Sequence, residues 1–78
     1  GPSVDEQVTQ CVMQGDNNCI IRLLEGRARS QTQLAQLIEA YRARGQTNRA
    51  IQHMRTFVQR YRGTSQARNY QQILARHQ

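Results

Sequence analysis

Two amphipathic helical patterns joined by a glycine constrain this chain more than any other feature of its sequence. They occupy residues 32–61, with Gly45 between them. In each half, apolar residues recur three and four positions apart, which is the periodicity of one helix face. Glycine is favoured where a helix ends in a left-handed backbone conformation. The segment therefore predicts an antiparallel helical hairpin with one apolar seam. The seam residues are Leu34, Leu37, Ile38, Tyr41, Ala50, Ile51, Met54, Phe57, Val58 and Tyr61.

The segments on either side of this hairpin also carry helical patterns. A capping box at residues 3–6 predicts a helix that starts near residue 4 and ends at the turn residues 15–18. A short second helix follows as far as Gly26, and a fifth is expected at residues 64–77. No segment has the alternating pattern of a strand, so the sequence predicts an all-α chain of five helices. The apolar face of the first helix is expected to contain Val4, Val8, Cys11 and Val12.

The first pair of helices is a shortened copy of the second pair. When Gly15 is aligned with Gly45, Cys11 falls at the position of Tyr41. Ile20 falls in the same way at the position of Ala50. An internal copy at a fixed offset is the signature of a helical-repeat protein.

The second hairpin resembles a tetratricopeptide (TPR) unit, whose pattern is a helix–turn–helix of about 34 residues. Leu37, Tyr41 and Ala50 stand at the Leu, Tyr and Ala positions of that pattern, with Gly45 at the turn. The resemblance implies a five-helix, right-handed TPR-like solenoid of two helical hairpins and a C-terminal capping helix. Residues 1–2 look like a tag-cleavage remnant, and 3–78 would form a single TPR-like domain. Its expected parts are a degenerate repeat at 3–26, a second repeat at 30–62 and a capping helix at 64–77.

In TPR arrays, partners dock on the concave surface formed by the first helix of each repeat. The resemblance therefore implies a non-catalytic docking or scaffold module that binds a protein or peptide, and a rigid spacer is an equal interpretation. When the partner-binding positions of TPR units are transferred to this sequence, the resemblance implies the following surface residues: Asp5, Glu6, Thr9, Met13, Thr32, Ala35, Gln36, Glu39, Arg42 and Ala43.

The charge of the chain is uneven. Residues 1–21 hold three acids and no Arg, whereas residues 22–78 hold all eleven Arg and two acids. The complete absence of Lys is typical of a GC-rich bacterial genome. Such a basic remainder suggests an anionic partner, for instance an acidic protein. The alternative function is an Arg-rich nucleic-acid-binding domain. It would use Arg42, Arg44, Arg49, Arg55, Arg60 and Arg62.

The two cysteines, Cys11 and Cys19, lie on either side of Gly15, each about four residues from it. In an antiparallel hairpin their side chains can meet, and a disulfide would join the first two helices. Two separate buried thiols are an equal alternative. A disulfide predicts a periplasmic or other extracytoplasmic location, whereas separate thiols predict the cytoplasm.

No pattern in the sequence predicts an enzyme, a cofactor or a metal site. The spacing of the cysteines does not match a zinc site, and His53 and His77 lie far apart. Neither histidine has the neighbours that acid–base or nucleophilic catalysis requires, so His53 is expected to face solvent and His77 to cover the edge of the core. No apolar run approaches the ~20 residues of a membrane span. The expected protein is the terminal part of a larger bacterial signalling or cell-envelope protein, with no membrane insertion of this domain.

Overall fold

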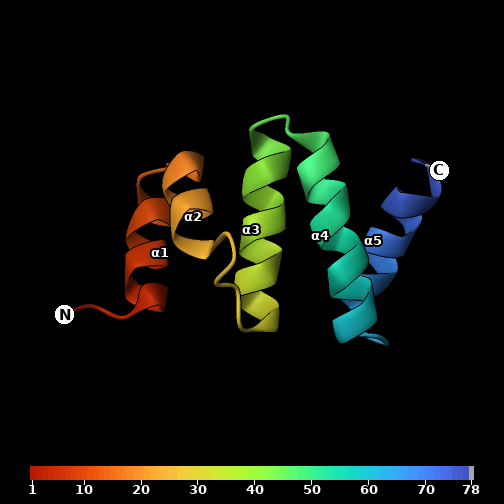
Figure 1. The fold of residues 1–78 in the computed structure, drawn as a ribbon, viewed down its shortest axis with the longest axis horizontal. Helices are drawn as coiled ribbons and strands as arrows, with labels where there is room; N and C mark the ends of the chain where they lie inside the picture. Colours follow the sequence, from red (N-terminus) through yellow and green to blue (C-terminus); the bar gives the residue numbers. More distant parts are fainter. Residues whose placement is uncertain (78) are drawn as a thin grey trace.

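The computed structural model describes residues 1–77 and confirms the prediction of an all-α chain. Its helices follow one another in chain order along the longest dimension of the molecule, which measures 40 Å (Figure 1). The main tertiary contacts join consecutive helices. No helix in the described chain has both the length and the apolar character needed to cross a membrane. The five described helices are α1 (Val4–Met13), α2 (Asn17–Leu24), α3 (Gln31–Ala43), α4 (Thr47–Arg60) and α5 (Ser65–Ala75).

Four of these helices begin at a side-chain N-cap. In each case the cap oxygen accepts a hydrogen bond from the backbone N–H three residues later, over 3.0–3.1 Å. A cap of this kind contributes about 1 kcal/mol to a helix. Helix α4 differs, because Gln46 precedes it without a side-chain cap. The four caps are Ser3, Asp16, Ser30 and Thr64.

The turns between α1 and α2 and between α3 and α4 have the same geometry. Gly15 and Gly45 have φ angles of +65° and +72°, a left-handed conformation that other residues adopt only with strain. In each turn the N–H after the glycine donates to a carbonyl five residues earlier, over 2.9 Å. This bond is typical of the Schellman motif. The donors and acceptors are Asp16 N to Cys11 O and Gln46 N to Tyr41 O.

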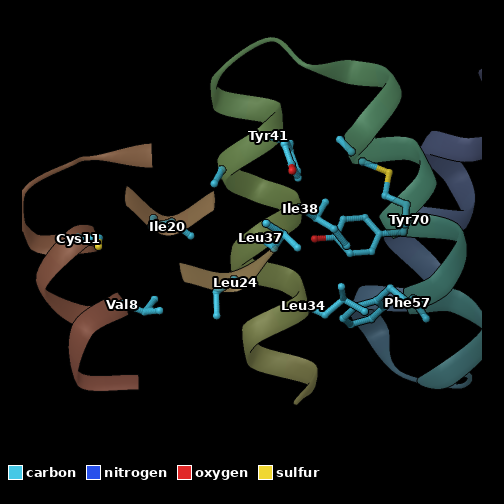
Figure 2. Close-up of a cluster of buried hydrophobic side chains, with 14 residues drawn as sticks. Val8, Cys11, Ile20, Leu24, Leu34, Leu37, Ile38, Tyr41, Phe57 and Tyr70 are labelled. Carbon is cyan, nitrogen blue, oxygen red and sulfur yellow. The ribbon is translucent and has the colours of Figure 1, made fainter. Parts of the chain in front are cut away.

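Helix α3 is the centre of the hydrophobic core (Figure 2). It contacts α2 on one side and α4 on the other, so it needs apolar residues over more than one narrow stripe. On the α5 side of the core, Tyr70 is fully buried and its ring meets that of Phe57 edge to face, with centroids 5.1 Å apart. The buried residues of α3 are Leu34, Leu37, Ile38, Ala40 and Tyr41.

The expectation that Val12 faces the core is wrong, since its side chain is 51% exposed. Helix α1 packs mainly against α2, and Val8 and Cys11 are the residues that it buries there. Val12 follows Cys11 directly and so lies about 100° further around the helix. The neighbouring Met13 is also exposed, at 75%. The end of α1 therefore presents two large apolar side chains outside the core.

A disulfide joins Cys11 of α1 to Cys19 of α2. Their Cα atoms lie 5.6 Å apart, within the usual range for such a bond. Cys11 is buried in the core, and the described chain has no free cysteine. Because α1 packs mainly against α2, this bond reinforces the contact that holds α1 to the rest of the molecule.

We expect reduction of the disulfide to lower the free energy of unfolding by about 2–3 kcal/mol, because the bond removes chain entropy from the unfolded state. Urea unfolding with and without reductant measures the change. The double variant Cys11→Ala/Cys19→Ala is the control, since reductant should not affect it. Intact mass after alkylation under denaturing, non-reducing conditions tests the bond directly, and two alkylated cysteines would contradict it.

Packing around α3 gives a second prediction. Ala40 is 1% exposed, so Ala40→Leu should overpack the core and cost about 1–3 kcal/mol of stability. Ala43 lies on the same helix but is exposed, and the matched change Ala43→Leu should stay within about 0.5 kcal/mol of the wild type. Thermal and urea unfolding of both variants make the comparison. Equal stability of the two variants would show that Ala40 does not occupy a close-packed site.

Candidate functional site

A hollow of about 440 Å³ lies where α3 and α5 come together. Helices α3 and α5 run in the same direction, because each is joined to α4 by a reversing turn (Figure 1). The hollow has an apolar floor that includes Ala35 and Phe57, and amide side chains surround it. We call it the α3–α5 hollow. Its lining residues are Gln31, Thr32, Ala35, Gln36, Glu39, Phe57 and Gln66.

A second hollow, of about 220 Å³, is formed by residues from the other end of α3 and of α5. Arg42 contributes the charged group, and Ile73 and His77 come from α5 and the residues after it. We call it the Arg42 hollow. Its remaining lining residues come from α4 and are Thr47, Ala50, Ile51 and Met54.

A polar bridge links the two hollows. The hydroxyl of Tyr70 donates to Oε2 of Glu39 over 2.8 Å, and Arg42 Nη1 donates to both oxygens of the same carboxylate over 3.1 and 3.2 Å. Glu39 lines the first hollow and Arg42 the second. The bridge therefore fixes α5 against α3 and holds one cation between the two hollows.

The sequence-predicted surface residues divide into three groups. Thr32, Ala35, Gln36 and Glu39 line the α3–α5 hollow, and Arg42 lines the second hollow. Asp5 joins α1 to α3, because its carboxylate accepts a 2.7 Å hydrogen bond from Gln33. The others are exposed and line neither of these hollows. They are Glu6, Thr9, Met13 and Ala43.

The sequence interpretation missed the contribution of α5, which it treated only as a cap. Gln66, Tyr70 and Ile73 come from this helix, and each belongs to a hollow or to the bridge. One signal was available. Tyr70 carries a hydroxyl on the apolar face of the helix, and a buried tyrosine usually hydrogen bonds to a polar partner.

A second polar cluster centres on Glu25, directly after α2. Its carboxylate accepts a hydrogen bond from the Tyr41 hydroxyl, while His53 Nε2 and the Gly26 N–H each lie 3.1 Å from it. Burial raises the pKa of Glu25, but these three contacts outweigh burial and leave the pKa below its ordinary value. The cluster connects the end of α2 to α3 and α4.

The expectation that His53 simply faces solvent is wrong. Its ring stacks on Tyr41 with centroids 5.6 Å apart, and its side chain is only 23% exposed. Its place is explained by Glu25, which supplies a hydrogen-bond partner next to the edge of the apolar seam. Among residues 1–77, no three metal-ligating side chains gather into a site that could hold an ion.

The Glu39–Tyr70 bond predicts a loss of stability in alkali. Burial, followed by the hydrogen bond to Glu39, raises the pKa of Tyr70 above its ordinary value. Such a group stabilises the folded chain below about pH 10, and this stabilisation is lost as the pH rises further, by at most about 1.4 kcal/mol per pH unit. The Tyr41 pKa is raised as well. With no Lys in the chain, tyrosine hydroxyls dominate proton release in this range. We expect the free energy of unfolding of Tyr70→Phe to fall less steeply with rising pH than that of the wild type.

Urea unfolding at a series of pH values between about 8 and 10.5 measures this slope. The control is Tyr61→Phe, because the Tyr61 hydroxyl donates to no side chain within the described chain and its loss should keep the slope. If the free energy of unfolding falls with pH equally in Tyr70→Phe and in the wild type, the folded chain does not favour the neutral form of the Tyr70 hydroxyl, and the prediction is wrong.

Comparison of the chain with protein-family models, with curated proteins and with solved structures finds no match. The α3–α5 hollow, the Arg42 hollow and the bridge between them are therefore the main structural guide to function.

Proposed function

We propose that this chain is a non-catalytic protein-interaction module with a TPR-like solenoid architecture, and that the groove formed by the α3–α5 and Arg42 hollows receives a peptide segment of its partner. The observation that carries the proposal is that residues of both α3 and α5 line each hollow, one hollow near the start of these helices and the other near their end. A groove between parallel elements suits an extended chain.

Two features support the repeat architecture. The turns at Gly15 and Gly45 have matching hydrogen bonds at an offset of 30 residues, and the main contacts join only consecutive helices. Nearest-neighbour packing of this kind is typical of solenoid proteins. In that architecture α1, α3 and α5 are the equivalent first helices, and α5 closes the array.

The groove favours a partner segment with one apolar and one acidic residue. The apolar floor of the α3–α5 hollow suits an aliphatic side chain, and Gln31, Gln36 and Gln66 can bond to a peptide backbone. The Oε1 of Gln36 is buried without a donor in the described chain, so a backbone N–H of the partner could satisfy it after a side-chain rotation.

Arg42 gives the groove its charged end. Its pair with Glu39 is about half exposed and uses only Nη1, so the other N–H groups of the guanidinium can donate to a partner carboxylate. Ala35 and Arg42 are seven residues apart on one helix, or about 10 Å. An extended peptide covers this span in about three residues. The favoured partner segment therefore has its acid about three positions from its apolar residue.

The disulfide is evidence about the cellular compartment in which the chain works. Disulfides persist in oxidising compartments, so the Cys11–Cys19 bond favours an extracytoplasmic module, for example in a bacterial cell-envelope protein. In that setting the partner segment would belong to another envelope or secreted protein.

Nucleic-acid binding is the second candidate function. Every Arg side chain is exposed, and within residues 1–77 only Arg42 pairs with a carboxylate. A basic surface with so little internal compensation attracts phosphates. The distribution of charge supports this candidate, while the groove supports the first.

Selection from a random-peptide display library tests the proposed groove. We expect enriched peptides to carry an acidic residue about three positions from an apolar one. Ala35→Arg should fill the first hollow and Arg42→Glu should reverse the charge of the second, so each should weaken binding at least about tenfold. The matched controls are Gln52→Arg and Arg44→Glu, at exposed positions that line neither hollow of the groove.

Equal loss of binding in the controls would show attraction by net charge instead of recognition in the groove. If no groove-dependent peptide is selected, binding to a random DNA duplex decides the second candidate. Steep salt dependence that disappears when Arg44, Arg49, Arg55, Arg60 and Arg62 are changed together to Gln would assign the basic surface to nucleic acid.

A further inference from the structure

A third hollow, of about 230 Å³, lies between the end of α2 and the second half of α4. It shares no residue with the two hollows of the groove. The side chains of Leu24, Leu34 and Leu37 give it an apolar floor, and Thr56 supplies a hydroxyl. We call it the Arg29–Arg60 pocket. Its other lining residues are Glu25, Gly26, Ala28, Arg29, His53 and Arg60.

The one acid in this pocket already has its partners. Glu25 accepts from the Tyr41 hydroxyl and from the Gly26 N–H, and it lies 3.1 Å from His53 Nε2. These contacts keep the carboxylate ionised, since its pKa is below the ordinary value. They also direct it toward α3 and α4, and neither arginine of the pocket reaches it.

The two cations of the pocket have no such partners. Arg29 comes from the connector between α2 and α3, and Arg60 comes from the last turn of α4. Within the described chain neither guanidinium pairs with a carboxylate. Two arginines from separate elements therefore line one small hollow with an apolar floor.

We propose that the Arg29–Arg60 pocket binds a small organic acid. Guanidinium groups bind carboxylates through paired, charge-assisted hydrogen bonds, so the carboxylate lies between Arg29 and Arg60. The apolar part of the ligand rests on Leu24, Leu34 and Ala28. At roughly 30 Å³ for each water molecule, the pocket has room for about eight waters, which limits the ligand to about ten non-hydrogen atoms.

Titration of the ¹⁵N-labelled whole chain with benzoate, followed by NMR, tests this proposal. Benzoate supplies a carboxylate on a small apolar ring, and benzamide is its neutral counterpart of the same shape. We expect saturable shifts with benzoate at the amides of Gly26, Ala28, Arg29 and Thr56, and none with benzamide. Equal shifts with both compounds, or shifts spread over all arginines, would overturn the proposal.

Two kinds of variant sharpen the test. Arg29→Gln and Arg60→Gln should each weaken benzoate binding about tenfold, because each removes charge-assisted hydrogen bonds. Ala28→Leu should block the pocket with no change of charge. The control is Arg44→Gln, which removes the same charge from an exposed residue outside the pocket. A control that weakens binding as much as Arg29→Gln would show attraction by net charge alone and overturn the proposal.

A carboxylate can also arrive at the end of a peptide. Competition between benzoate and the tripeptide Gly-Gly-Leu, compared with its C-terminal amide, separates the two sources. Displacement of benzoate by the free tripeptide alone would assign the pocket to chain termini, and no displacement would assign it to free small acids. This proposal does not depend on the groove, since Ala35→Arg should leave benzoate binding unchanged.

Discussion

Helix α3 must be buried on two sides, and the rest of the structure depends on this constraint. A chain of this size has a thin core, with roughly 3–5 kcal/mol of net stability from packing. Leu37, Ile38 and Tyr41 are all nearly inaccessible on a single helix. That burial is possible only because α2 and α4 both pack against α3. Loss of either contact would expose part of the core that the other helices share.

Polar contacts between the helices add a second level of order, and most of them involve α3. Gln33 bonds to Asp5 of α1, Tyr41 bonds to Glu25 after α2, and Glu39 accepts from Tyr70 of α5. These bonds fix the positions of α1, α2 and α5 along α3. The last two also border the groove and the Arg29–Arg60 pocket. The same side chains therefore hold the helices together and shape the candidate sites, so binding and stability are physically coupled.

Local chemistry made the helices predictable from sequence. The caps, the glycine turns and the apolar periodicity act over a few residues, and all of them could be read directly. Partners that lie far apart in the chain could not be read from the sequence in this way. His53 seemed solvent-facing by periodicity, yet its position is set by Glu25, which lies 28 residues away. Val12 fitted the apolar pattern of α1, but no helix covers that side. The hollows involve residues from three or more segments, so no local pattern could reveal them.

The use of acids explains why the surface remains strongly basic. After residue 21 the chain has only two acids, Glu25 and Glu39, against eleven arginines. Each of these two carboxylates accepts a hydrogen bond from a buried tyrosine. They therefore hold the helices together, and among residues 1–77 Arg42 is the only arginine that gains an ion pair from them. Internal neutralisation of the other arginines would require acids that the chain does not have. Counter-charges for these arginines come from outside the chain, and this deficit underlies the carboxylate proposed for the pocket lined by Arg29 and Arg60.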